Sequence, residues 1–402
     1  RSARARLVLT KLPMVVPFRL RATLFHDLIA HDRATSMGPS SRMRIRRDFL
    51  YEDSMSAFFD ALRSHGAVGL KRSPHVIFID EHGLQEAGID GGGLRREFLE
   101  TLSKRVFDPQ YSLLSLSPKQ ALYPNPTPAV PLEDAEDHYF FMGTVLGKLM
   151  YENQLMEAQF ADFFLCVLCG SMCACACVCV CVCDPEFYRH LMSVKDYEGD
   201  VEDLGLTMSV SVESYGSHTE VDLVPGGRSV AVTGDNLRAY IRAVSDFKLN
   251  RQIAAQSNAF LRGFKAIIRK DWLKMFAPSE LQMLISGAEE SVDVDDLWRH
   301  MNLNRYLPTD GPILALRAVL DGFDNAQLSK FLKFVTGCSR PPLLGFDHLD
   351  PPFTVQRVED VSRLPSSGTC FNLLKLPAHE DPAELRKRLL LAIEHGTGFA
   401  LS

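Results

Sequence analysis

The sequence predicts an α+β fold with two or three domains. At 402 residues the chain is too long for one small core. Most of its longer segments have apolar residues at helical spacing, which predicts helices. A few short runs predict strands, because they alternate between apolar and charged residues or are continuously apolar. The hydrophobic and charged contents, 46% and 23%, are typical of a globular protein.

The net charge of −6 gives no reason to expect nucleic acid or a membrane as a partner. Residues 1–50 are more basic, with eleven Lys and Arg against three Asp and Glu. Because apolar residues are interleaved with the basic ones, we expect residues 1–45 to form a basic helical extension, with two amphipathic helices broken near Pro13 and Pro17. The chain has no initiator Met and no secretory signal pattern, so we expect a fragment of a longer protein. We expect that protein in the cytoplasm, with the nucleus as a second location.

The N-terminal part begins with short strands and a glycine-rich segment. Strands are predicted at 42–47 and 75–79, and a helix at 53–62 lies between them. The three glycines at 91–93 precede a predicted helix at 94–107. Glycines in front of a helix can cradle a phosphate, but the Lys-Ser/Thr pair of a P-loop is absent here. A flexible turn is therefore favoured over a nucleotide site.

An apolar helix is predicted at 139–152. Gly143 and Gly147 lie four residues apart on it. Glycine has no side chain, so we expect another helix to approach closely at these positions.

Residues 163–183 form a stretch of 21 residues without a charge, and it interrupts the otherwise ordinary sequence. Its cysteines could bind soft metals, but strict alternation differs from the CxxC spacing of zinc sites. It is long enough for a membrane span, yet Asp162 and Asp184 flank it and no basic cluster orients it. Low-complexity sequence of the kind that a TG-rich nucleotide repeat encodes is the favoured interpretation. The aberrant tract, 166–183, contains eight cysteines: Cys166, Cys169, Cys173, Cys175, Cys177, Cys179, Cys181 and Cys183.

Regular patterns resume after this tract. A strand is predicted at 203–209, and a strand, a Pro-Gly-Gly turn and a second strand at 223–236. The Pro, Gly and Asn content of 301–312 predicts a linker. A helix with an apolar face is predicted at 313–335. Further helices are predicted at 246–268, 271–276, 279–286 and 384–393, and a strand at 353–358.

Cys370 lies alone near the C-terminal end, with no second cysteine at CxxC spacing. Pro365, two serines, Gly368 and Thr369 precede it, and the apolar run that starts at Phe371 follows. This pattern predicts a turn or an exposed loop that leads into an apolar strand. A thiol in such a loop is a candidate nucleophile, although most single cysteines are small buried apolar residues.

The segment 364–372, Leu-Pro-Ser-Ser-Gly-Thr-Cys-Phe-Asn, resembles the active-site loop of HECT-type ubiquitin-protein ligases. Further segments resemble that family in the same order along the chain. They are the glycine-rich segment 88–98, the helix 139–152, Asp-Pro-Glu-Phe-Tyr at 184–188, the Pro-Gly-Gly segment 225–236, and 334–346.

The resemblance implies a bilobal fold, with a mostly helical N-lobe joined by a hinge to a smaller α/β C-lobe. On this basis the N-lobe is expected at 46–300, the hinge at 301–312 and the C-lobe at 313–402. The small subdomain that binds the conjugating enzyme is expected at about 157–245. The implied partners are an E2 conjugating enzyme, ubiquitin and protein substrates, and no cofactor is implied.

The resemblance also implies that Cys370 accepts ubiquitin as a thioester and passes it to a substrate lysine. We expect the Thr369 hydroxyl and the loop amides up to Phe371 to stabilise the thiolate and the oxyanion, and Asn372 to fix the loop. Glu394 is the candidate base for the lysine. The aromatic Phe399 matches the family residue that anchors the tail against the N-lobe. Many family members have a histidine where Gly368 stands, so no imidazole is adjacent here to lower the pKa of the thiol.

Two alternatives to a ligase stay open. A cysteine protease or deubiquitinase would pair Cys370 with His379 or His395, but neither histidine lies in a protease-like motif. The other alternative is an inactive fragment in which the tract 166–183 binds metal or inserts into a membrane.

Overall fold

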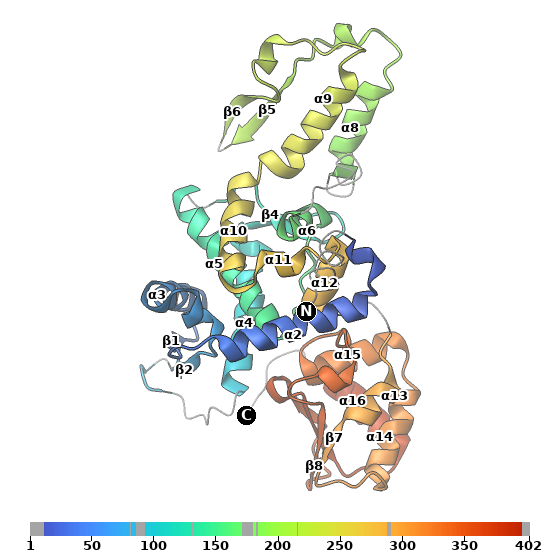
Figure 1. Ribbon diagram of the computed structural model, residues 1–402. Helices are drawn as coiled ribbons and strands as arrows, with labels where there is room; N and C mark the ends of the chain where they lie inside the picture. The colour runs from blue at the N-terminus through green and yellow to red at the C-terminus, as the bar shows by residue number, and fades with distance from the viewer. Residues whose placement is uncertain are drawn as a thin grey trace. The chain divides into compact units, whose positions relative to one another are not determined.

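Figure 1 shows the computed structural model of the chain. The structure describes residues 12–80, 82–85, 93–129, 132–170, 180–181, 184–214, 216–287 and 291–395. The chain divides into two compact units. The first consists of Arg1–Val15, Val106–Gly147 and Ala158–Gln282, and the second of Val16–Arg105, Lys148–Glu157 and Met283–Ser402.

Two helices have backbones that nearly touch, α5 (Leu132–Tyr151), which belongs to the first unit up to Gly147, and α10 (Ala254–Ile267). A Cβ atom at Gly143 would lie 1.9 Å from the carbonyl oxygen of Phe260. A Cβ at Gly263 would lie 1.8 Å from the carbonyl oxygen of Phe140. The predicted close approach of a second helix at Gly143 is therefore confirmed.

The start of the cysteine tract is helical. Helix α6 (Asp162–Cys169) packs against α10, with the rings of Phe164 and Phe260 in edge contact at 5.1 Å. Cys166 and Cys169 are buried on α6. Cys181 is exposed, and the remaining cysteines of the tract lie outside the described residues.

A second cluster of buried residues in the first unit lies among α8 (Pro185–Lys195), α9 (Leu237–Asp246) and the antiparallel hairpin of β5 (Ser209–Ser214) and β6 (Ser217–Asp222). This hairpin was not predicted from the sequence, and the two predictions for the neighbouring segments, 203–209 and 223–236, need correction. The predicted strand 203–209 begins within a 3₁₀ turn, Val201–Leu204. The predicted strand pair at 223–236 is wrong, because a 3₁₀ turn, Gly227–Ser229, occupies this segment.

The first part of the second unit confirms the N-terminal predictions. Strands β1 (Arg42–Arg46) and β2 (His75–Ile79) pair in parallel, and α3 (Leu50–Lys71) connects them. Helix α4 (Gly93–Val106) follows the glycine-rich segment, as predicted. Of the two predicted basic helices, α2 (Phe18–Thr35) is present, and residues 1–11 lie outside the described part.

The C-terminal part of the second unit contains a four-stranded sheet in the order β7-β8-β10-β9. Strands β7 (Asn302–Asn304), β8 (Thr354–Val358) and β10 (Leu373–Pro377) are parallel, and β9 (Ser366–Gly368) is antiparallel to β10. This pattern agrees with a mixed α/β unit. Helices α13 (Val294–His300), α14 (Gly311–Asp321), α15 (Asn325–Thr336) and α16 (Pro382–His395) belong to the same part.

Two predictions for this part need correction. The predicted linker 301–312 contains the edge strand β7 and the buried Tyr306, whose hydroxyl donates to the carbonyl of Leu376 at 3.0 Å. The predicted helix 313–335 is two helices, because Asp324 begins α15 with a capping box. Its predicted apolar face is buried as expected, from Leu316 and Val319 to Phe331 and Leu332.

The remaining elements are short or lie between those above. They are η1 (Pro13–Val15), η2 (Pro109–Tyr111), the antiparallel pair β3 (Leu114–Leu116) and β4 (Leu122–Pro124), the π-helical turn η5 (Phe247–Arg251), α11 (Lys270–Leu273), α12 (Pro278–Ser286) and η6 (Phe346–His348).

Candidate active site at the Cys370 turn

Residues Gly368–Asn372, here called the Cys370 turn, connect two strands of the C-terminal sheet. Thr369–Phe371 form a single 3₁₀ turn, η7, and Gly368 pairs with Leu373 where β9 meets β10. Leu374 and Leu376 of β10 are fully buried. The predicted loop that leads into an apolar strand is therefore confirmed for the backbone. The side chain of Cys370 lies outside the described part of the structure.

Asn372 fixes the C-terminal end of the Cys370 turn. It adopts a left-handed conformation, with φ 48°, and its side chain is fully buried. Its Nδ2 donates to the carbonyl oxygen of Pro351 at 2.5 Å. Its own carbonyl accepts from the amide of Thr354 at 2.9 Å, where β8 begins. Asparagine tolerates the left-handed region better than most residues, so this position suits its backbone and its side chain together.

The N-terminal side of the Cys370 turn contacts a carboxylate from a distant part of the sequence. The Thr369 hydroxyl donates to Oε2 of Glu100 on α4 at 3.3 Å. Oε1 of the same carboxylate accepts from Nζ of Lys104 at 2.8 Å. The sequence predicted that this hydroxyl would help stabilise the thiolate, but in the structure its proton is directed to Glu100.

Gly337 brings α15 close to the same carboxylate. It ends α15 in a left-handed conformation with φ 79°, which favours glycine. A Cβ atom there would lie 3.1 Å from Oε1 of Glu100. Helix α15 also packs against β9 and η7. Glu100 therefore lies where the end of α15 and the start of the Cys370 turn meet.

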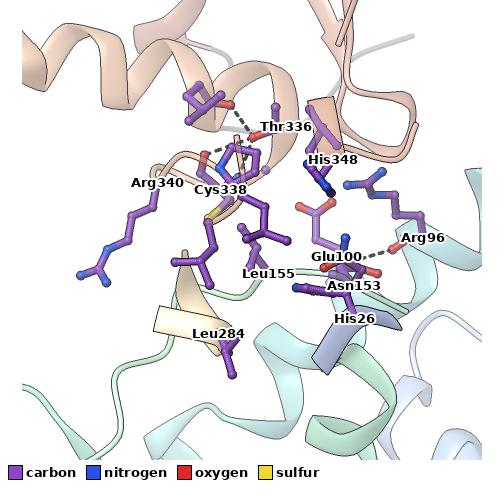
Figure 2. Close-up of a pocket in the computed structure, with 17 residues that line it drawn as sticks. His26, Arg96, Glu100, Asn153, Leu155, Leu284, Thr336, Cys338, Arg340 and His348 are labelled. Atoms are coloured by element: carbon purple, nitrogen blue, oxygen red, sulfur yellow. Dashed lines mark hydrogen bonds between the residues drawn. The ribbon is translucent and has the colours of Figure 1, made fainter. Parts of the chain in front are cut away.

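A cavity of about 130 Å³ opens beside Glu100. Figure 2 shows it with Glu100 and Arg96 of α4, His26 of α2, and Cys338 and His348 from the segment that follows α15. Its lining is mixed, because leucines of α12 and α15 and of the loop after α15 contribute as well. The carboxylate thus borders an open space of the second unit.

Cys338, in the segment 334–346, is a structural residue. Its side chain is buried, and its Sγ–H donates to the carbonyl of Ser286 at 3.8 Å. Burial raises the pKa of the Cys338 thiol to about 11. This thiol is therefore protonated at neutral pH and a poor nucleophile.

Of the other predicted site residues, the structure describes the side chains of Phe371 and Glu394. The ring of Phe371, next to Cys370, is 47% exposed, which makes it an accessible apolar surface beside the thiol position. Glu394 is exposed on α16. Phe399 lies outside the described residues. Sequence spacing gave no signal for Glu100, because 269 residues separate it from Thr369.

The structure describes part of the residues on which the alternatives depend. His379 follows β10, and its Nε2 is buried without a hydrogen-bond partner among the described residues. The His395 side chain is outside the described part. Within the residues that the structure covers, no group of three or more His, Cys, Asp or Glu is arranged to hold a metal ion. None of the described helices combines the length and the apolar character that a membrane crossing requires.

The family described as HECT-domain (ubiquitin-transferase) matches residues 100–402. This match covers most of the chain, so the chain belongs to the HECT-domain family. The membership confirms the resemblance seen in the motifs, and with it the α+β class of the fold.

Individual relatives are ubiquitin-protein ligases by name. The chain is 40% identical to E3 ubiquitin-protein ligase UPL6 of Arabidopsis thaliana, across 100% of this chain and 40% of that protein. It is 37% identical to Ubiquitin-protein ligase E3B of Mus musculus, across 99% of this chain and 40% of the relative. It is 38% identical to Probable E3 ubiquitin protein ligase C167.07c of Schizosaccharomyces pombe, across 98% of this chain and 38% of that protein. The chain therefore spans about 40% of the length of these relatives.

Proposed function

We propose that this chain is the catalytic region of an E3 ubiquitin-protein ligase, with Cys370 as the residue that carries ubiquitin. The observation that carries the proposal is the Cys370 turn within a HECT-family chain. It places the backbone of a lone cysteine at the end of a sheet, next to the exposed ring of Phe371. A carrier thiol must be reachable by a large protein partner, and a turn between two strands offers such access.

The first step in this proposal is a thioester exchange. The Cys370 thiolate attacks the carbonyl carbon of ubiquitin that is bound to the conjugating enzyme. The new C–S bond forms, the old one breaks, and the sulfur of the conjugating enzyme leaves as a thiolate. Backbone amides of the Cys370 turn are the proposed donors to the oxyanion of the intermediate. The energies of the two thioesters are similar, so positioning matters more than driving force.

The partners follow from the same proposal. The cluster of α8, β5, β6 and α9 lies within the expected subdomain at about 157–245, and we assign to it the binding of the conjugating enzyme. The lobes at 46–300 and 313–402, a hinge near 301–312, and the location in the cytoplasm or nucleus remain predictions. So do the substrates and the tail residue Phe399. No observation favours a protease over this function.

A thioester assay tests the proposal. The chain is incubated with ubiquitin, an activating enzyme and a panel of conjugating enzymes, and adducts are separated with and without reductant. We expect a ubiquitin adduct that reductant removes and that Cys370→Ala abolishes. Cleavage of a fluorophore from the ubiquitin C-terminus without any conjugating enzyme would instead indicate a protease.

A further inference from the structure

The carboxylate of Glu100 contacts the Cys370 turn. It accepts the Thr369 hydroxyl at 3.3 Å and the Lys104 ammonium at 2.8 Å. Its side chain is 21% exposed, so it is partly accessible to solvent. Adjacent Cα atoms are about 3.8 Å apart, which puts this carboxylate within about 10 Å of the Cys370 backbone.

The negative charge of Glu100 affects the two steps of the proposed reaction differently. A negative charge close to a thiol disfavours its thiolate, so Glu100 gives no advantage in the thioester exchange. The second step begins with a lysine ammonium, which a carboxylate attracts and can deprotonate. Glu100 therefore suits the transfer to lysine and not the loading of Cys370.

The Glu100 carboxylate has free acceptor positions and nearby space with which to bind a lysine ammonium. Two oxygens of an ionised carboxylate offer about four acceptor positions, and Thr369 and Lys104 occupy one each. The two bonds fix the orientation of the group, while Gly337 leaves space beside it that a Cβ atom would fill. The cavity next to Glu100 offers room for a side chain that enters from solvent.

We propose that Glu100 binds and deprotonates the acceptor lysine during transfer from Cys370, and that Thr369 positions Glu100 against the turn. This inference rests on the proposed function, because it requires the thioester on Cys370. It assigns the role of base to a residue that the sequence did not indicate, in place of Glu394.

The lysine ammonium gives a proton to the Glu100 carboxylate, which later releases it to water. The amine nitrogen then forms a bond with the thioester carbonyl carbon, and the C–S bond breaks. The electron pair of that bond stays on the Cys370 sulfur as a thiolate. This thiolate takes the second proton that the nitrogen loses, and the products are an amide and a free thiol.

A single-turnover experiment with two nucleophiles tests the inference. The chain is first loaded with ubiquitin on Cys370 and then exposed to free lysine or to hydroxylamine. Hydroxylamine is uncharged at pH 7.5 and needs neither attraction nor deprotonation of a cation. We expect Glu100→Gln to load normally and to discharge to lysine about 10–100-fold more slowly. Discharge to hydroxylamine should stay within about twofold of the unaltered chain, which a merely structural defect would not allow.

Three further variants sharpen the result. Glu100→Asp keeps the charge on a shorter side chain, and we expect it to retain more lysine discharge than Glu100→Gln. Glu136→Gln makes the same chemical change in an exposed ion pair with Arg262, and it should match the unaltered chain. Glu394→Gln tests the rival base, and a lysine-selective defect in this variant alone would overturn the assignment to Glu100.

The outcomes distinguish the two proposals. If Cys370→Ala still forms the adduct, the proposed function itself fails. If the adduct is on Cys370 but Glu100→Gln discharges to lysine at the normal rate, the role of Glu100 is refuted alone. Equal slowing of the discharge to lysine and to hydroxylamine would also reject it, and so would loss of loading in Glu100→Gln, since both indicate a structural contribution.

Discussion

Asn372 is the residue whose backbone and side chain hold the Cys370 turn in place. Replacement with Ala removes the bond to Pro351 and places a residue with a Cβ but no local hydrogen bond in a left-handed conformation. We expect Asn372→Ala to cost about 2–3 kcal/mol of unfolding free energy. Asn372→Gly loses the bond but not the backbone preference, so it should cost less. The melting temperatures should therefore fall in the order Asn, Gly, Ala.

The control for this comparison is Asn304→Ala, an exposed position on the edge strand β7, where we expect almost no change. An Ala variant at 372 as stable as the unaltered chain would show that the buried amide does not hold the turn.

The buried thiols give a second prediction at the residue scale. Burial raises the pKa of Cys338 to about 11 and that of Cys169 to about 12. Both groups are thus protonated far above neutral pH. We expect iodoacetamide at pH 7.5 to leave both unmodified in the folded chain and to modify both in denaturant, as measured by peptide mass spectrometry. Rapid modification of either thiol in the folded chain would contradict their burial.

At this scale the sequence located the position of a candidate nucleophile but not its surroundings. The motif around Cys370 predicted a turn followed by an apolar strand, because turn residues and apolar alternation are local signals. The contact between Thr369 and Glu100 joins two residues that are 269 positions apart in the sequence. No spacing along the chain encodes such a contact.

The close pair α5 and α10 shows how one glycine controls the packing of a helix. Gly143→Ala would place a Cβ atom 1.9 Å from the Phe260 carbonyl, so the helices must move apart. We expect a loss of about 1–3 kcal/mol of unfolding free energy. Gly234→Ala is the matched control, since no atom lies within 4 Å of a Cβ at that position. Equal melting temperatures for the two variants would refute the tight packing.

Elements with a strong periodic pattern of apolar residues were predicted well. Strands that depend on pairing with another strand were not. The helices α3, α4 and α5 and the strands β1 and β2 follow from local patterns. The hairpin of β5 and β6 was missed because its strands are rich in Ser and Glu and only partly buried. Strand β7 was read as part of a linker, because its three residues, Asn-Leu-Asn, become a strand only by pairing with β8.

The division of the whole molecule depends on contacts that a linear sequence does not display. The second unit combines Val16–Arg105, Lys148–Glu157 and Met283–Ser402, which are far apart along the chain. Composition can indicate boundaries between consecutive segments, but it cannot indicate that distant segments share one unit. The predicted lobes therefore remain predictions, whereas the family was recognisable from its motifs.

The central claim is that Cys370 carries ubiquitin, and peptide mapping of the loaded chain tests it most directly. Cleavage after Arg363 and Lys375 releases the peptide 364–375, in which Cys370 is the single cysteine. Mass spectrometry at low pH should find the thioester-linked remnant of ubiquitin on this peptide and lose it after treatment with reductant. A reductant-sensitive remnant on another cysteine, with this peptide unmodified, would contradict the account.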